Sequence, residues 1–341
     1  MDNIKKNHHY IPRFYVKQFS DNEKSVGMYL NRFQKDIPDA SIVKIFYSDY
    51  LYGKNNALED ALMNVEGHWS RLIYSINKSN ILPSSKLAHQ QLIYFMLVSK
   101  YRTLITANTN KNLIDKLQEI GFLKSNTTKQ TLLQVPNAIP LKVALESYSI
   151  VEDLELLLIH NSTSLGFITS DNPICLYNPF YALKQHKGGN HLYNVGIMIF
   201  MPISPKNCLV LYDKDTYIMK DINNNSILLE DRSNIQQMNI MLADNSYNCL
   251  IYNNRQNSYI IDLIPFINPN KVLPVYDQGF LSPIYPTGVY ELSFFELNEN
   301  MLDIILPDTR EGIKRPSAQK ALYSNISAFF DKLSEHGHGW L

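Results

Sequence analysis

The stretch Val151-Glu152-Asp153-Leu154-Glu155-Leu156-Leu157-Leu158-Ile159-His160 lies where the chain changes from one apolar pattern to another. Before about residue 148, apolar residues recur every three or four positions, which is typical of amphipathic helices. From Val151 onward they form short runs bounded by Asn, Asp, Pro or Gly, which is typical of strands. The sequence therefore predicts an α+β fold, with a helical N-terminal half packed against a mixed or antiparallel β-sheet half that carries additional helices.

The first half is expected to be mainly helical. One helix is predicted over Leu58–Ile76, and a second is predicted from a serine cap at Ser85 to about Ile120. A shorter helix is predicted around Thr128–Leu133, and a hairpin at Ser25–Leu30 precedes all three.

Strands are predicted in the second half for Leu154–His160, Gly166–Ile168, Ile197–Met201, Leu209–Tyr212 and Cys249–Tyr252. Asp231–Asn245 has an acid and a serine near its start, so we expect a helix that packs on the sheet. Pro274–Gly288 predicts an extended arm, and Ser317–Phe330 predicts a helix. These patterns divide the chain into regions 1–147, 148–255 and 256–341.

Composition narrows the class of protein. Hydrophobic residues make up 45% of the 341 residues and charged residues 19%, as in an ordinary folded soluble protein. Lys+Arg and Asp+Glu both number 32, which does not favour a general nucleic-acid coat or a membrane-surface binder, although a local basic groove for nucleic acid stays open. No segment has the pattern of a signal peptide or a membrane span, so we expect a cytoplasmic protein. The oligomeric state does not follow.

The three cysteines, Cys175, Cys208 and Cys249, each lie inside an apolar run at wide spacing. An odd number without a CxxC pair argues against a disulfide framework and against a zinc knuckle. They are predicted to be thiols of the core, in a reducing compartment.

The opening segment, Asn7 to Phe19 (NHHYIPRFYVKQF), combines imidazoles, cations and aromatic residues. Neighbouring side chains point to opposite sides of a strand, so His8 and His9 do not ligate one metal together, and we expect His9 to face the site. A neutral imidazole can act as an acid, a base or a ligand, while Arg13 and Lys17 are predicted to hold an anion. The alternative is that the aromatic residues pack on the core with His8, Arg13 and Lys17 at its edge.

Two glutamates on the predicted helix Leu58–Ile76 are expected to face an arginine on the next predicted helix. Glu59 and Glu66 are seven residues apart and so lie within about 20° of each other around the axis, beside the apolar stripe. Arg102 shares an apolar face with Tyr94 and Val98, where an unpaired charge would be costly. The pattern predicts a buried ion pair of Arg102 with Glu59 or Glu66, either as a scaffold contact or as part of a site.

The third polar element follows a strand. Ile168-Thr169-Ser170-Asp171-Asn172-Pro173 places Asp171 where an apolar run ends, a position from which a rigid strand aims a side chain at a ligand. Ser-Asp-Asn-Pro is also an ordinary turn sequence whose polar side chains bond their own backbone. Both interpretations stay open at this point.

Taken together, these motifs resemble a bacterial family called domain of unknown function 4238. The resemblance rests on the opening segment, the Leu58-Glu59…Glu66 helix, Lys100-Tyr101-Arg102-Thr103, Ser170-Asp171-Asn172-Pro173 and Pro202-Ile203-Ser204-Pro205, and it spans roughly residues 5–255. It implies a soluble bacterial protein and carries no established activity. It also implies that His9, Glu59, Glu66, Arg102 and Asp171 belong to one recurring set.

Two functions of different classes follow. The first is a metal-dependent hydrolase of nucleic acid or another phosphoester, in bacterial defence or conflict. In it Glu59, Glu66 and Asp171 hold a divalent metal such as Mg²⁺ or Mn²⁺. His9, Glu66, Arg102 and Asp171 would be its catalytic residues, and Arg13 and Lys17 would bind the substrate. The second is a non-catalytic ligand- or partner-binding sensor, whose polar cluster is a structural network that joins the helical half to the sheet.

Overall fold

The computed structural model describes residues 5–54, 56–119, 138–179, 190–219, 221–271, 305–307 and 315. Its helices are α1 (Arg13–Lys17), α2 (Ala57–Ser79), α3 (Lys86–Tyr101), α4 (Leu104–Glu119), α6 (Ala138–Glu146), α7 (Tyr148–Val151), α9 (Arg232–Asn245) and α10 (Asn257–Leu263), with short 3-10 helices η1 (Ile42–Lys44), η2 (Asn254–Gln256) and η3 (Ile264–Phe266). Its strands are β1 (Asn7–His9), β2 (Ser25–Leu30), β3 (Lys35–Ser41), β4 (Tyr47–Asp49), β5 (Glu155–Asn161), β6 (Thr169–Ser170), β7 (Cys175–Tyr177), β8 (Met198–Pro202), β9 (Asn207–Tyr212), β10 (Tyr217–Met219), β11 (Ser226–Leu229), β12 (Cys249–Tyr252) and β13 (Ile305–Pro307). The predicted α+β fold is confirmed.

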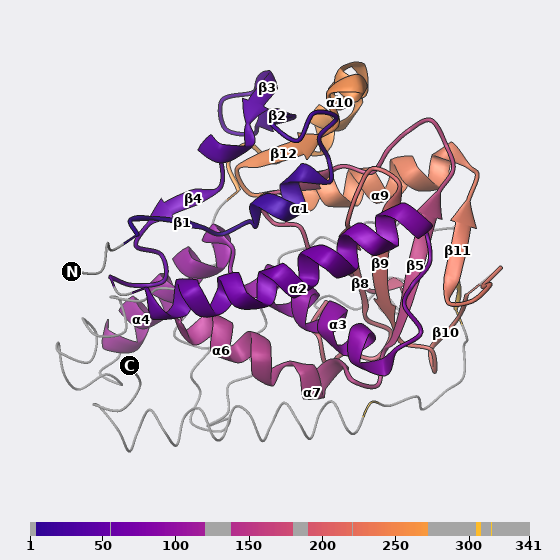
Figure 1. The fold of residues 1–341 in the computed structure, drawn as a ribbon, viewed down its shortest axis with the longest axis horizontal. Coiled ribbons are helices and arrows are strands. Elements are labelled where there is room, and N and C mark those ends of the chain that lie inside the picture. Colours follow the sequence, from indigo (N-terminus) through magenta and orange to yellow (C-terminus); the bar gives the residue numbers. More distant parts are fainter. Residues whose placement is uncertain are drawn as a thin grey trace.

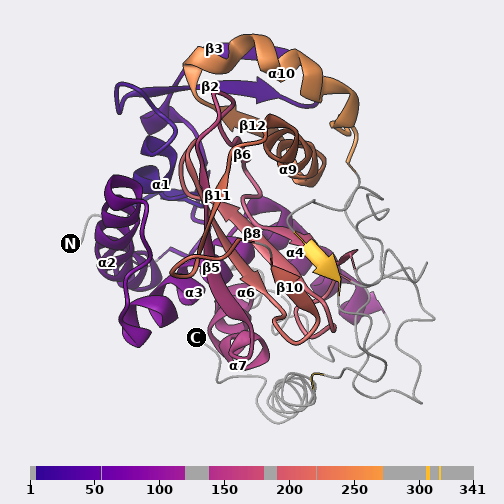
Figure 2. The same ribbon diagram turned by 90° about the vertical axis from the view of Figure 1, so that its right-hand side faces the viewer.

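A five-stranded mixed sheet lies at the centre, in the order β11-β5-β9-β8-β7 (Figures 1 and 2). β11 pairs with β5 in parallel, and the other neighbours are antiparallel. Along β5, Leu156 and Leu158 pack into the core shared with the N-terminal helices, whereas Leu157 and Ile159 pack into the core shared with α9. Both faces are covered, which is why this strand is a continuous apolar run and not an alternating one.

A second sheet joins the two halves of the chain. Its order is β3-β2-β12-β6, so the hairpin of residues 25–41 pairs with a strand more than 200 residues later. Gly27 in β2 lies under the ring of Tyr252, and a Cβ at this position would overlap that ring. The strands on either side of residue 148 therefore share one hydrogen-bonded sheet.

The predicted helix from Ser85 to Ile120 is wrong in one respect, because the structure has two helices, α3 and α4, with a break at Arg102 and Thr103. The Thr103 hydroxyl lies 3.3 Å from Thr106 N and so caps the start of α4. Thr103 itself is fully buried. A threonine that bonds the backbone locally favours a helix start over helix continuation, and here that tendency prevails over the continuous apolar stripe.

Most other predicted elements are confirmed within a residue or two. α2, α9 and β12 match their predicted ranges closely, while the Gly166–Ile168 run lies just before β6. The elements that were not predicted include α1, α6, α7, α10, β1, β4, β7, β10, β11 and β13. The predicted Thr128–Leu133 helix, Pro274–Gly288 arm and Ser317–Phe330 helix fall outside the described residues. All three cysteines are buried and free, as predicted.

Polar groups fasten the N-terminal helices to the central sheet. Tyr15 OH lies 2.6 Å from Thr169 Oγ1 and donates to Pro202 O at 2.7 Å. Asn77 at the end of α2 donates to Ile203 O at 3.0 Å and accepts from Asn207 Nδ2 at 3.1 Å.

None of the helices in the described ranges is both long and apolar enough to cross a bilayer.

Candidate functional site

The two neighbouring histidines of β1 point to opposite sides of the strand, as predicted. His8 is fully buried, which corrects the expectation that it lies at the edge of the core. Its Nδ1 accepts a hydrogen bond from Tyr52 N at 3.0 Å, so Nε2 carries the ring hydrogen and donates to Lys5 O at 2.9 Å. The ring also stacks on Tyr52, with centroids 5.4 Å apart. Both nitrogens are used, so His8 is a structural residue.

Arg102 pairs with Glu66, which confirms the predicted buried ion pair. Arg102 is 2% exposed, and its Nη1 lies 2.6 Å from Glu66 Oε1. Its Nη2 donates to the carbonyl of His9 at 2.7 Å, and its Nε donates to Tyr52 OH at 3.0 Å. Tyr52 OH donates in turn to the same His9 carbonyl, at 3.0 Å. The guanidinium thus joins α2 and α3 to β1 and the segment after β4.

Burial and neighbouring charges shift the pKa values of the residues in this network. Burial raises the pKa of Tyr52 to about 12, although the adjacent guanidinium acts the other way. Burial also raises the pKa of Glu59, and the nearby Arg102 guanidinium opposes that shift. The pKa of Arg102 is raised by Tyr52 and Glu66, in opposition to its burial. These values keep Tyr52 neutral and Arg102 charged at neutral pH.

Asp171 bonds a different part of the chain from the Arg102 network. Its carboxylate accepts the backbone N–H groups of Tyr247 at 3.0 Å and Asn248 at 2.8 Å, in the turn that leads into β12. Asn172 N bonds Ser170 Oγ at 3.0 Å, so Ser-Asp-Asn forms a local turn. Burial raises the pKa of Asp171, and the backbone amides act in the opposite direction. The side chain is fully engaged in holding the β6–β12 corner.

The predicted metal set is therefore not assembled. Among the described residues, no group of three or more His, Cys, Asp or Glu side chains is placed to hold a metal ion, and Glu59, Glu66 and Asp171 all belong to those residues. Glu66 is engaged by Arg102, and Asp171 by backbone amides. Arg102 bonds Glu66 and the His9 carbonyl and lies near Glu59, whereas the Asp171 carboxylate bonds the backbone of the turn before β12.

His9 lies between this network and the molecular surface. Its Nε2 accepts a hydrogen bond from Arg13 Nε at 3.1 Å, and its ring lies 5.9 Å from that of Tyr47. Burial, followed by the nearby charges of Arg13 and Arg102, lowers the pKa of His9 to about 4. The ring is thus neutral at neutral pH, and its Nε2 lone pair is available to Arg13.

A groove opens on the other side of Arg13. It has a volume of about 680 Å³, within the range of small-molecule sites. The cations Arg13, Lys17 and Lys24 line it, together with Glu23 and Ser41, and Phe14, Ile42 and Val43 supply apolar surface. Arg13 and Lys17 come from α1, Lys24 from the loop before β2, and Val43 from η1. The groove brings together the two residues predicted to bind an anion and adds a third cation.

Three cations line the groove, Arg13, Lys17 and Lys24, against one carboxylate, Glu23. Lys17 Nζ lies 3.4 Å from Glu23 in an exposed and therefore weak pair. Within the described parts of the chain, neither Lys24 Nζ nor the two terminal nitrogens of Arg13 has a hydrogen-bond or ion-pair partner. The groove thus presents donors to an incoming anion.

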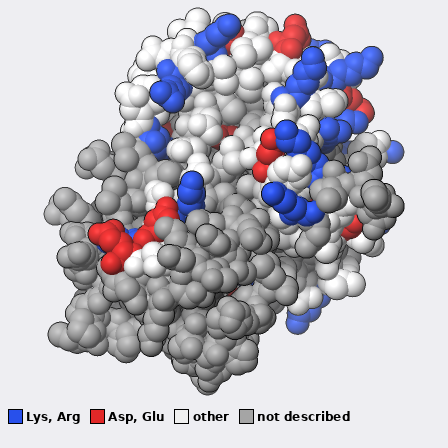
Figure 3. Space-filling view, turned by 90° about the vertical axis from the view of Figure 1, so that its left-hand side faces the viewer, with Lys and Arg blue, Asp and Glu red and all other residues white. Residues whose placement is uncertain are grey.

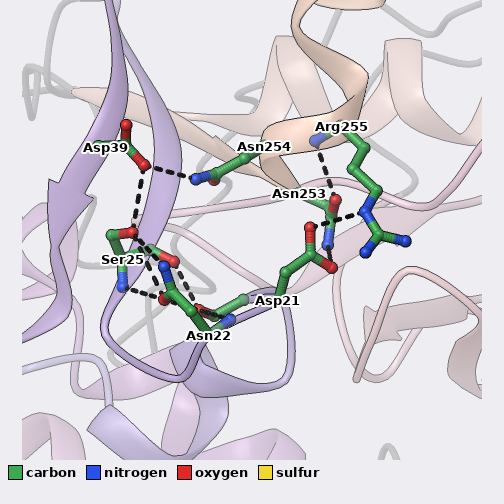
Figure 4. Close-up of polar contacts among 8 residues, drawn as sticks. Asp21, Asn22, Ser25, Asp39, Asn253, Asn254 and Arg255 are labelled. Atoms are coloured by element: carbon green, nitrogen blue, oxygen red, sulfur yellow. Dashed lines mark hydrogen bonds and ion pairs between the residues drawn. The ribbon is translucent and has the colours of Figure 1, made fainter.

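A polar clasp holds the loop that carries Lys24. We use this name for Asp21, Asn22, Ser25, Asp39, Asn253, Asn254 and Arg255 (Figure 4). Asn22 Oδ1 accepts from Lys24 N at 2.8 Å, and Asp39 accepts from Asn254 Nδ2 at 2.8 Å. Asp21 accepts from Asn253 Nδ2 at 2.8 Å and pairs with the exposed Arg255. Residues of η2 and the turn before it, far along the chain, thus fix one wall of the groove.

Two bulky residues flank β4 in the left-handed backbone region. Phe46 has φ 61° and Tyr50 has φ 52°, values that cost about 1–2 kcal/mol each for residues with a Cβ. Tyr10 N bonds Phe46 O at 2.9 Å, and Tyr50 N bonds Lys6 O at 2.8 Å, so both strained residues are tied to the β1 segment. Both strained residues are therefore bonded to residues next to β1, the strand that contains His9.

Basic and acidic side chains are mixed on the side of the molecule where the N-terminus lies. In Figure 3, Lys and Arg gather along the upper and right-hand parts of this face, with Asp and Glu between them. The described surface seen in this view has no continuous basic band of the kind that tracks a nucleic-acid backbone. The groove is a local concentration of cations.

Several residues were missed from the sequence. Tyr52 and Lys24 lie in no motif, and the burial of His8 is set by partners far along the chain. Arg315 is 3% exposed, pairs with Asp153 at 2.5 Å and donates to Ile150 O at 2.6 Å. The only signal for it was Asp153, an acid between an apolar helix and an apolar strand. Pairing across more than 150 residues leaves no local pattern.

The family comparison covers His9, Arg13, Lys17, Lys24, Glu59, Glu66, Arg102 and Asp171. The family described as "Protein of unknown function (DUF4238)" matches residues 7–256, most of the chain. This chain belongs to the DUF4238 family. The resemblance drawn from the opening segment and the Arg102 and Asp171 motifs is thereby confirmed. Comparisons with curated proteins and with solved structures returned no match.

Proposed function

We propose that this DUF4238 protein is a non-catalytic module that binds an anionic small molecule in the groove of Arg13, Lys17 and Lys24. The observation that carries the proposal is the groove itself, because it combines three cations with an apolar lining and leaves donors of Arg13 and Lys24 without partners in the described residues. Small-molecule sites typically join such a concave apolar surface to a few polar groups that fix the ligand.

The engagement of the catalytic candidates also supports a binding role. Glu66 and Arg102 neutralise each other in a buried pair, and the Asp171 carboxylate bonds the backbone. His9 has a low pKa and a lone pair directed to Arg13, which makes it a poor general base near neutrality. The metal-dependent hydrolase, and with it a role in defence, stays a prediction without a supporting contact.

The sensor hypothesis expected a polar network that joins the helical half to the sheet. The network around Arg102 joins other segments. Arg102 connects α2, α3 and β1, while the helical half is fastened to the central sheet by Tyr15 and Asn77. The buried pair is thus part of the support of the groove, since it holds the strand from which His9 contacts Arg13.

The test uses the full chain and simple anions as probes. Isothermal titration with inorganic phosphate and with sulfate should detect binding that Arg13→Ala and Lys24→Ala each weaken, by about tenfold for the loss of one charged hydrogen-bonding group. Lys111→Ala is the matched control, because it removes an exposed lysine of α4 that does not line the groove. Equal affinities of all four proteins would refute the site.

A second measurement separates binding from catalysis. The protein is incubated with Mg²⁺ or Mn²⁺ and a chromogenic phosphodiester or a short oligonucleotide, with Glu66→Gln as the comparison. We expect no turnover. Metal-dependent cleavage that Glu66→Gln abolishes would overturn the proposal in favour of the hydrolase.

A further inference from the structure

The guanidinium of Arg13 is anchored at one nitrogen only. Its Nε donates to His9 Nε2 at 3.1 Å, while Nη1 and Nη2 have no partner in the part of the chain that the structure describes. The side chain is exposed and lines the groove. A guanidinium held at Nε still offers its outer N–H groups as a planar fork, which matches two oxygens of a phosphate or a carboxylate.

His9 can serve as this anchor because its own position is fixed. Its carbonyl accepts from Arg102 Nη2 and from Tyr52 OH, and its strand pairs with β4, where His9 lies opposite Tyr47. Four independent elements, α3, β1, β4 and the segment after β4, therefore determine where the imidazole lies.

The protonation state of His9 also suits an acceptor. Burial and the charges of Arg13 and Arg102 lower its pKa to about 4, against a weaker opposing contact with the backbone of Val43. Nε2 therefore keeps its lone pair at neutral pH. A protonated imidazole would repel the guanidinium instead of orienting it.

We infer that His9 is the positioning residue of the groove, which holds Arg13 at Nε and so directs its outer N–H groups at an anion that presents two oxygens. This inference rests on the proposed function and specifies its ligand, a phosphate- or carboxylate-bearing small molecule whose apolar part contacts Phe14 and Val43. Arg102 acts one step further away, because it holds the His9 carbonyl.

The consequence for affinity follows from conformational freedom. An exposed arginine side chain has many rotamers, and fixing it on binding opposes association. With His9 in place, part of that freedom is already lost before the ligand arrives. Removal of the acceptor should weaken anion binding on the order of tenfold, the effect of one charge-assisted hydrogen bond.

The experiment compares His9→Phe with His9→Gln in titrations with sulfate and with acetate. Sulfate keeps its charge across the usable pH range, so its own titration does not enter. We expect His9→Phe to bind about tenfold more weakly and His9→Gln to stay within about threefold of the wild type, because an amide oxygen also accepts from Arg13. His68→Phe, on the exposed side of α2, is the matched control.

A double-mutant cycle shows whether His9 acts through Arg13. In an Arg13→Lys background, which retains the charge and lacks Nε, His9→Phe should cause no further loss. Arg13→Lys alone should lose about as much as His9→Phe, and this variant keeps the whole His9 region intact if His9→Phe fails to fold. The probe bound more tightly, sulfate or acetate, separates a phosphate-like ligand from a carboxylate.

The outcomes separate this inference from the proposed function. Weaker binding in Arg13→Ala and Lys24→Ala together with unchanged binding in His9→Phe would refute the positioning role and leave the groove intact. An equal effect of His9→Phe with and without Arg13→Lys would also refute it. Absence of any effect in every groove variant would remove the proposed function itself.

Discussion

Replacement of Arg102 is the sharpest test of the buried network. Arg102→Ala removes the ion pair with Glu66 and the donors to the His9 carbonyl and Tyr52 OH, at a side chain that is 2% exposed. Loss of one partner of a buried ion pair typically costs about 3–5 kcal/mol. The Glu66 side chain is 21% exposed, so water can partly hydrate it once Arg102 is removed. We therefore expect a loss of about 3 kcal/mol in the free energy of unfolding, at the lower end of that range.

The pairwise part of this loss can be isolated. Arg102→Met keeps most of the apolar volume, and Glu66→Gln keeps an acceptor without a charge. The cycle formed by these two variants and their combination should give a coupling energy of about 1–2 kcal/mol, because contacting residues of one network are not additive. Asp60→Asn is the control on the same helix, since its ion pair with Lys5 is exposed and should contribute less than about 1 kcal/mol.

The assay is urea denaturation followed by far-UV circular dichroism and by tryptophan fluorescence. Coincident transitions from the two probes justify a two-state fit, and the loss should appear in the midpoint without a change in slope. The reasoning fails if Arg102→Ala loses no more than Asp60→Asn, or if the coupling energy between Arg102 and Glu66 is near zero. Either result would mean that the pair adds nothing to the packing around it.

Three further predictions concern single positions. Gly27→Ala should destabilise the protein by about 2–3 kcal/mol, because the new Cβ overlaps the Tyr252 ring in the β2–β12 pair, and an unchanged melting temperature would contradict that packing. Asp171→Asn should lower the free energy of unfolding by about 1.5–3 kcal/mol, because the charged acceptor of the Asn248 amide is lost, and full stability in urea would show that the carboxylate is not needed in the turn. His9 has a folded pKa of about 4, below the unfolded value of 6.5, so its contribution is complete above pH 6.5 and is lost as the pH falls toward 4. His9→Gln should flatten that part of the pH–stability curve by about 1–2 kcal/mol after allowance for solvent screening of a half-exposed ring, and an unaltered curve would contradict the low pKa.

Local patterns account for what could be predicted of the fold. The apolar stripe of α2, the Asp231 cap of α9 and the run that forms β12 are each complete within one segment, and each is confirmed. The break between α3 and α4 was missed because Thr103 competes with an apolar stripe that continues past it. The short strands β7, β10 and β11 were missed because three or four residues carry too little pattern.

Part of the site could also be predicted from a local pattern. A charged residue on an apolar helix face requires a partner, so Arg102 and its glutamate could be identified without a structure. Asp171 could not be assigned, because a strand-end carboxylate that faces a ligand and one that binds the next turn have the same sequence. Lys24 joined the groove only through the clasp that fixes its loop.

By itself, the sequence determined the α+β class, the main helices and strands, the family and the need to pair Arg102. Only the tertiary structure decided that His8 is buried and His9 contacts Arg13, that Asp171 serves a turn, and that β2 pairs with β12. Periodicity and capping act over a few residues and leave a readable pattern. Contacts between distant segments depend on which faces meet in the packed chain, and a single sequence does not record that choice.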